Sequence, residues 1–229
     1  MFVNRKPRPK IPGPTPEAAA PRRVPAQARS RKRLERILEA AGYVFAEQGY
    51  EAATMEAIAA RAETSIGSIY QFFPNKLAVF NALAAHHHER LRALFDAVFA
   101  GPLLDRPWPE VLEAGLDAFA AFHETDPGFR AVWVGMHLTE EVVAEGEALN
   151  REFARRIEDL LGAKLPGLAP RQRPLIATMV VEVVTAILIV SVRRPSEAPA
   201  LLRETKALLR RYLEPYDTRR AGRGRSGSR

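Results

Sequence analysis

Apolar residues recur with a helical period along almost the whole chain. Between residues 34 and 45 they are spaced by three, four and seven positions, which places them on one side of a helix. This helix is predicted to span residues 29–48 and to end at Gly49, because glycine suits the position that follows a helix. No segment alternates apolar and polar residues as a half-buried strand does. The predicted fold class is therefore all-α.

Two short helices joined by a tight turn are predicted next. Thr54 is a typical N-cap residue and opens a helix that ends near residue 62. Ser65 opens a second helix, over residues 66–72, which ends before Pro74 because proline disfavours helical backbone at the residue before it. Asn75 then opens a longer helix. This arrangement is typical of a helix-turn-helix, whose second short helix enters the major groove of DNA.

Further helices follow to about residue 212, which gives about nine in total. Prolines separate them, because proline interrupts a helix. One segment, residues 175–192, is long and apolar enough to be considered as a membrane span. Glu182 lies at its centre, where a carboxylate would cost about 3 kcal/mol in a bilayer. A buried helix of a soluble bundle is therefore favoured. The remaining predicted helices span residues 75–100, 109–125, 127–140, 141–161, 170–192 and 195–212.

Charge, proline content and the predicted helices together divide the 229-residue chain into four parts. The net charge is +7, but residues 1–33 carry +9 and residues 215–229 carry +4, so the region between them is acidic. Residues 1–28 hold seven of the 18 prolines and few large apolar residues, which predicts a disordered basic arm. Residues 215–229 are predicted to be a second disordered basic tail. Between them we expect a helix-turn-helix domain over residues 29–80 and a helical domain over residues 81–214.

Several classes of site are not supported by the sequence. The chain has no cysteine, which excludes disulfides, thiolate metal sites and cysteine nucleophiles. It has no glycine-rich phosphate loop and no nucleophile elbow, so no catalytic residue is assigned and no enzyme is expected. Three consecutive histidines, 86–88, point in different directions around a helix, so no metal site or cofactor is predicted. The polar N-terminal segment does not resemble a secretory signal, and a cytoplasmic location with no membrane partner is expected.

The sequence of the two short helices resembles the DNA-binding region of a known family. It reads TMEAIAARA over residues 54–62 and SIGSIYQFFPNK over residues 65–76. These strings are similar to the amino-terminal region of the TetR, or tetracycline-repressor-like, family of transcriptional regulators. The resemblance covers residues 31–83. This chain departs from the family at Glu63, where a turn glycine is usual, and at Phe72, where many members have histidine or another aromatic residue.

The predicted DNA contacts lie around the second short helix. Thr54 can present a hydroxyl and an amide to a phosphate, Gly67 allows close approach of the backbone, and Gln71 can bind an adenine edge. The resemblance implies phosphate contacts from Tyr70 and Lys76. Because residues 34–80 carry a net charge of −3, a basic cluster at residues 29–33 is expected to supply positive charge. The predicted set is Arg31, Lys32, Arg33, Thr54, Thr64, Ser65, Gly67, Ser68, Tyr70, Gln71 and Lys76. Ile58, Ile69 and Phe73 are assigned to packing.

Aromatic residues are concentrated in the central helices. They can line a pocket for an apolar molecule, and they can equally pack as core, so both interpretations stand. The resemblance implies a small-molecule effector and a dimer formed by the last two helices. The candidate effector-binding residues are Phe95, Phe99, Phe119, Phe122, Trp133, Met136 and His137.

The function expected from these features is a ligand-responsive transcriptional regulator. The simplest form is a repressor that binds a pseudo-palindromic operator as a homodimer and is released by an apolar or aromatic effector. The alternative is a helical adaptor that binds only proteins and carries a vestigial helix-turn-helix. Specific binding to a palindromic duplex separates the two.

Overall fold

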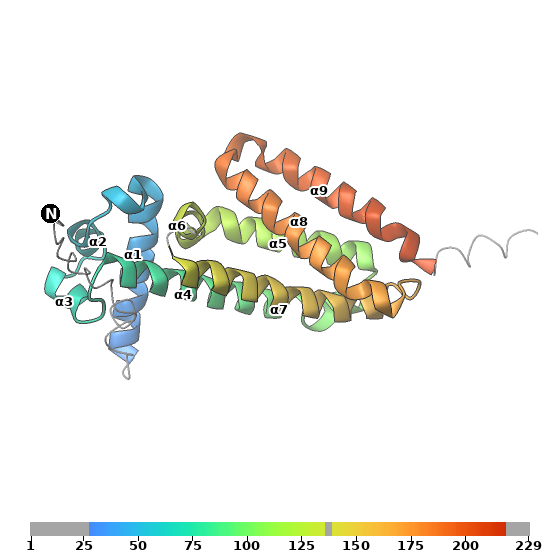
Figure 1. Ribbon diagram of the computed structural model, residues 1–229, viewed down its shortest axis with the longest axis horizontal. Coiled ribbons are helices and arrows are strands. Elements are labelled where there is room, and N and C mark those ends of the chain that lie inside the picture. Colours follow the sequence, from blue (N-terminus) through green and yellow to red (C-terminus); the bar gives the residue numbers. More distant parts are fainter. Residues whose placement is uncertain (1–27, 136–138, 219–229) are drawn as a thin grey trace, which may run out of the picture.

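The chain is helical throughout the part that the structure describes. A computed structural model describes residues 28–135 and 139–218, and these two ranges contain nine α-helices and no strand. The predicted all-α fold class is therefore confirmed. Residues 1–27 and 219–229, which make up most of the two predicted tails, lie outside the described residues, as do residues 136–138. Figure 1 shows an elongated molecule with α1–α3 at one end and α5–α9 at the other.

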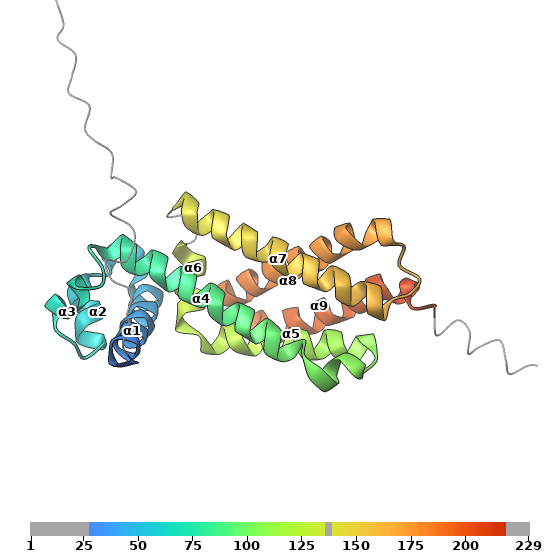
Figure 2. The ribbon, with the colours of Figure 1, turned by 90° about the horizontal axis from the view of Figure 1, so that it is seen from below.

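The N-terminal group consists of α1 (Ala28–Ala52), α2 (Met55–Arg61) and α3 (Ile66–Tyr70). The helix α4 (Lys76–Val98) leads out of this group and runs on into the C-terminal helices (Figure 2). Within α1, Gly49 has φ 78° and ψ 164°, so the regular helix is interrupted where the sequence predicts its end. One short turn beyond Gly49 completes α1.

Side-chain caps define the starts of the next three helices, as predicted. Thr54 accepts a hydrogen bond from the amide of the third residue of α2, and Ser65 and Asn75 do the same for α3 and α4. Each cap satisfies an amide that has no partner within its own helix. The sequence therefore fixes where these helices begin through local hydrogen bonds.

The helix-turn-helix is held by a packed apolar core. Ile58, Ile69 and Phe73 are all fully buried, which confirms their assignment to packing. The same core extends beyond the N-terminal group to Ala131 and Val132 of α6 (Pro127–Gly135). The N-terminal group is thus continuous with the rest of the molecule through α4 and α6.

The C-terminal group builds two further apolar cores, between α4, α5 and α7–α9. Where one helix over residues 127–140 was predicted, α6 ends at Gly135 and Thr139 caps the next helix. Of the described helices, only the segment Pro170–Arg193 is long and apolar enough to cross a membrane, and 22% of its apolar window is buried. In Figure 1, α8 and α9 lie side by side. The helices are α5 (Trp108–Thr125), α7 (Glu140–Lys164), α8 (Arg173–Arg193) and α9 (Ala198–Leu213).

The predicted boundary at residue 215 is corrected by the structure. A 3-10 helix, Glu214–Tyr216, follows α9, and the carbonyl of Tyr216 accepts a hydrogen bond from the amide of Gly167 at 3.1 Å. The indole of Trp108 donates to Asp217 at 2.8 Å. Residues 215–218 therefore belong to the folded domain, because they close its end away from α3.

Glu63 occupies the turn between α2 and α3 with φ 49°, in the left-handed region. This backbone costs an L-residue about 1–2 kcal/mol. We predict that Glu63→Gly raises the free energy of unfolding by about 0.5–1 kcal/mol, because glycine adopts this conformation without strain. Urea unfolding followed by circular dichroism measures the change.

The matched control is Glu56→Gly, at an exposed site in the first turn of α2. Glycine within a helix is unfavourable, so this change should lower the free energy of unfolding by about 1 kcal/mol. Equal losses in both variants would show that the turn at Glu63 is unstrained.

Candidate nucleic-acid interface and effector cavity

The α3 helix and the residues around it present several of the predicted DNA-binding residues to solvent. Ser65, Gly67, Tyr70 and Gln71 are exposed, as is Thr54 at the start of α2. The hydroxyl oxygens of Thr54 and Ser65 accept amides at 3.1 Å and 3.2 Å, which leaves each hydroxyl proton available to a phosphate. These residues form one polar surface around α3. Thr64, in the turn, is half-buried.

Gly67 leaves open space on the outer side of α3. A Cβ atom added there would meet nothing within 4 Å among the described residues. Glycine in a helix costs about 1 kcal/mol relative to alanine, and no packing among the described residues requires it here. The open position allows another molecule to approach the α3 backbone closely.

One predicted DNA-contacting side chain of α3 is placed differently from expectation. Ser68 is half-buried, and its hydroxyl oxygen is buried without a hydrogen-bond partner among the described residues. In this arrangement Ser68 does not offer its hydroxyl to a base. Phe72, the departure from the family pattern just beyond α3, is 4% exposed and belongs to the core.

Lys76 has a structural role that replaces the predicted phosphate contact. Its Nζ donates to the carbonyls of Tyr50, Glu51 and Ala53 at 2.5, 3.0 and 2.9 Å. It also lies 4.5 Å from the centre of the Tyr50 ring. An ammonium group has three donors, and all three are used on carbonyls at the end of α1. Lys76 therefore ties the start of α4 to the end of α1.

Positive charge near α3 is scarce. Arg61 forms two hydrogen bonds to Glu47, at 2.9 and 2.7 Å, and stacks over the Tyr43 ring at 4.4 Å. With Lys76 also engaged, two of the three cations between residues 34 and 80 have partners within the domain. By contrast, residues 31–33 at the start of α1 are exposed and form no ion pair with a described residue. This basic cluster is therefore available to a phosphate backbone.

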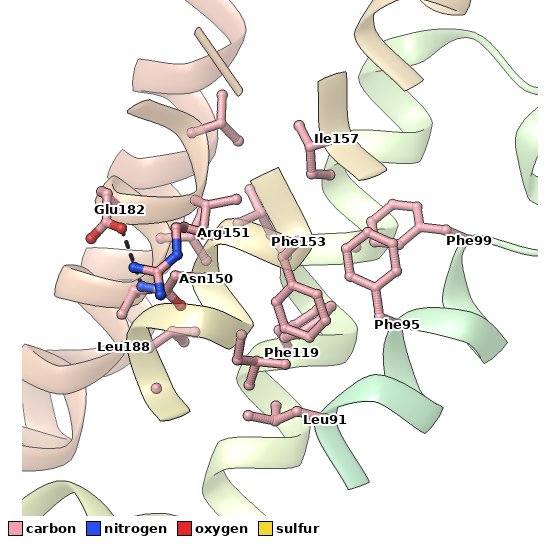
Figure 3. A pocket seen from close by; sticks show the side chains of 18 of the residues that line it. Leu91, Phe95, Phe99, Phe119, Asn150, Arg151, Phe153, Ile157, Glu182 and Leu188 are labelled. Atoms are coloured by element: carbon pink, nitrogen blue, oxygen red, sulfur yellow. Dashed lines mark hydrogen bonds between the residues drawn. The ribbon is translucent and has the colours of Figure 1, made fainter. Parts of the chain in front are cut away.

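A cavity of about 600 Å³ lies within the C-terminal group. Figure 3 shows its aromatic side, where Phe95, Phe99, Phe119 and Phe153 come together from α4, α5 and α7. The rings of Phe95 and Phe153 stack with centroids 4.8 Å apart. A volume of this size and an apolar lining suit a small organic molecule.

Four of the seven predicted effector-binding residues line this cavity, namely Phe95, Phe99, Phe119 and Trp133. Phe122 does not line it; its ring stacks on that of His87, with centroids 5.6 Å apart. Met136 and His137 lie outside the described residues.

The cavity also has a polar edge that the sequence analysis did not identify. Asn150 of α7 donates to Glu182 of α8 at 3.2 Å, and Arg151 lies beside them (Figure 3). Arg151 also pairs with Glu147 at 3.4 Å. These groups come from two helices that are distant in sequence, and Glu182 was considered only as a charge within an apolar segment. This edge thus carries two carboxylates, Glu147 and Glu182, and one guanidinium, Arg151.

A buried polar cluster borders the cavity at the end nearest α1. His87 and Asp126 are each 2% exposed at the side chain, and His87 Nδ1 lies 3.2 Å from Asp126 Oδ2. Arg90 binds the same oxygen at 2.9 Å, and the amide of Gly128 in α6 donates to Oδ1 at 2.8 Å. No sequence spacing signals this cluster, because His87 and Asp126 are 39 positions apart.

Burial and neighbouring groups shift pKa values in this cluster and in the histidines beside it. Burial lowers the pKa of His88 to about 4, with further lowering by His87 and Arg92. Burial likewise lowers the pKa of His123 to about 4. For Asp126, burial alone raises the pKa, but the hydrogen bond from His87 and the electrostatic interactions with His87 and Arg90 outweigh it. At neutral pH, His88 and His123 are therefore uncharged and Asp126 is ionised.

Substitution of Lys76 tests whether its side chain stabilises the fold or contacts DNA. We predict that Lys76→Met lowers the free energy of unfolding by about 1–3 kcal/mol, because three carbonyls at the end of α1 lose a charged donor. The matched control is Lys32→Met, which should change stability by less than about 0.5 kcal/mol yet weaken DNA binding. Thermal unfolding and titration of duplex DNA measure the two effects. A Lys76→Met protein with unchanged stability but weakened DNA binding would restore the phosphate contact.

Comparison with known proteins agrees with the geometry. The family model of bacterial regulatory proteins of the tetR family matches residues 37–83, and the model of the tetracyclin repressor-like C-terminal domain matches residues 107–213. The transcriptional repressor KstR of Mycolicibacterium smegmatis is 38% identical over 72 residues. That alignment covers 31% of this chain and about a third, 35%, of KstR.

Solved structures extend the similarity to the whole fold. A TetR-family transcriptional regulator from Streptomyces coelicolor is 30% identical, with a TM-score of 0.55 over 80% of this chain and 99% of that one. The complex of SmeT with triclosan has a TM-score of 0.63 and 22% identity, over 81% of this chain and 92% of SmeT. This chain belongs to the TetR family of bacterial transcriptional regulators.

Proposed function

We propose that this protein is a homodimeric transcriptional regulator that binds a pseudo-palindromic operator and responds to a small apolar effector. The observation that carries the proposal is the pairing of an exposed, glycine-containing α3 surface with an aromatic cavity in one chain. Family membership supports both halves, because TetR-family regulators bind DNA and small-molecule effectors.

The proposed DNA contacts divide into base reading and phosphate binding. Gln71 is exposed at the end of α3 and reads a base edge in the major groove. Thr54, Ser65 and Tyr70 bind phosphates on either side of the groove. The basic cluster at residues 31–33 supplies the charge that the acidic helix-turn-helix lacks.

Repression is the proposed output, by occupation of a promoter. KstR, which is 38% identical to this chain over 72 residues, is described as a repressor. The effector acts by favouring a dimer in which the two α3 helices no longer match successive major-groove sites. The apolar core shared by α1, α4 and α6 supports this coupling, since α4 also lines the cavity.

The proposed dimer interface is the outer face of α8 and α9. Leu175 and Met179 on α8 are 69% and 46% exposed, and Leu208 and Tyr212 on α9 are also exposed. Monomeric proteins rarely leave large apolar side chains of neighbouring helices in water. Two copies packed through these helices form a four-helix bundle around a two-fold axis.

Selection of random duplexes on the purified protein tests the DNA-binding function. We expect recovered sequences with two-fold symmetry, bound more tightly than random DNA at moderate salt. Gln71→Ala should relax the preference at one or two positions in each half-site, whereas the control Gln172→Ala, exposed in the C-terminal group, should leave the motif unchanged. Binding that depends on salt but not on sequence would overturn the proposal and favour a protein-binding adaptor.

A second experiment tests the dimer. The double variant Leu175→Glu with Met179→Glu places charges on the proposed interface, so we predict dissociation to monomers at micromolar concentration. Sedimentation velocity measures the change, and Ala85→Glu, on an exposed face of α4, is the control that should remain dimeric. A double variant that stays dimeric would place the interface elsewhere.

A further inference from the structure

Two buried nitrogen atoms at the cavity wall have no hydrogen-bond partner among the described residues. They are Nε2 of His87 and Nε1 of Trp133, and both side chains line the cavity. Both rings also pack on Phe129, at centroid distances of 5.5 and 5.4 Å, so they belong to one aromatic cluster. Buried polar groups in proteins are nearly always paired. Two such atoms in one cluster indicate that a partner from outside the chain completes this wall.

The hydrogen bonds around His87 determine what that partner must offer. Asp126 is held by Arg90 and by the amide of Gly128, so its carboxylate accepts from Nδ1 of His87. In the neutral imidazole with its proton on Nδ1, Nε2 is an acceptor. The indole Nε1 of Trp133 is always a donor. With this form of His87, the wall offers one acceptor and one donor.

The same end of the cavity is unsuited to a charged ligand group. Burial keeps His88 and His123 uncharged at neutral pH, because the pKa of each is about 4. The one carboxylate of the cluster, Asp126, is already satisfied by its three partners. A charged group would be desolvated here without a counter-ion.

We propose that the effector carries a neutral hydroxyl group that binds His87 and Trp133, and that it is therefore an alcohol or phenol with an apolar body. The hydroxyl donates to Nε2 of His87 in its neutral form, and the oxygen of the same hydroxyl accepts from Nε1 of Trp133. The apolar body lies against Phe95, Phe119 and Phe153. This inference rests on the proposed function, because it specifies the ligand of the same cavity.

The position of His87 also connects this group to the DNA-binding helices. His87 is held by Asp126, which holds Gly128 in the first turn of α6, and α6 packs more extensively on α1 than on any other helix. Both nitrogens are covered in the structure, so a hydroxyl reaches them only when neighbouring side chains move. That movement takes place beside the contact between α6 and α1.

The test uses isomeric probes that differ only in their polar group. The dye N-phenyl-1-naphthylamine reports occupation of the cavity through its fluorescence. Its displacement is measured with 1-decanol, which donates and accepts, and with 1-methoxynonane, which has the same atoms but only accepts. The ratio of the two displacing concentrations is compared between wild type and variants, because this comparison cancels the difference in water solubility of the probes.

Four variants separate the contributions. His87→Asn keeps an amide that can donate to Asp126 but places nothing at Nε2, whereas His87→Gln retains a polar atom near Nε2. Trp133→Phe keeps an aromatic ring at this position and removes the indole N–H donor. His86→Asn is the control, because His86 does not line the cavity. Circular dichroism verifies that each variant is folded.

We expect the preference for 1-decanol over 1-methoxynonane to fall by about five- to tenfold in His87→Asn, the loss of roughly one buried hydrogen bond. Trp133→Phe should weaken the binding of both probes, and His87→Gln and His86→Asn should retain the preference. An unchanged ratio in His87→Asn, together with unchanged binding of both probes to Trp133→Phe and normal dye binding, would overturn the hydroxyl site and leave the effector cavity standing. Absence of dye binding to the wild type would instead overturn the cavity as a ligand site, and both proposals with it.

Discussion

The continuous apolar core that joins α1, α4 and α6 is the constraint on which the rest of the structure depends. It buries the helix-turn-helix residues Ile58, Ile69 and Phe73 together with Ala131 and Val132 of α6. Because close-packed interiors transmit displacement rather than absorb it, the helix-turn-helix cannot move independently of α4 and α6. Lys76 reinforces this connection by tying α4 to the end of α1. Residues of both α4 and α6 line the cavity, which is the structural basis of the proposed coupling between effector binding and the placement of α3.

The features that were predicted correctly from the sequence are those fixed by local interactions. The helix starts at Thr54, Ser65 and Asn75 follow from cap side chains that accept from an amide only three residues later. The break at Gly49 follows from the residue type alone. The missed features depend on partners distant in the chain. Lys76 binds carbonyls more than 20 positions earlier, and His87 pairs with Asp126 across 39 positions. Periodicity identifies an aromatic residue as buried, but it cannot distinguish Phe122, which packs on His87, from a cavity-lining residue.

The negative net charge of the folded helix-turn-helix is unfavourable for binding to the phosphates of its proposed nucleic-acid partner. Arg61 and Lys76 are used to hold the helix-turn-helix together, and the surrounding glutamates leave the domain acidic. In the proposed complex, attraction to DNA therefore comes from the first turn of α1 and from the basic sequence before it. The proposal thus gives two parts of the chain different roles, since α3 would discriminate between sequences and the basic residues would supply salt-dependent affinity.

Gly67 has a consequence for what the fold tolerates on the outer side of α3. A Cβ atom added at this position would meet nothing within 4 Å among the described residues. Replacement of a helical glycine by alanine also favours the helix itself. The fold therefore accepts a methyl group at residue 67, so that in the proposed complex a single substitution there would change the surface that α3 presents to DNA without loss of a stable fold.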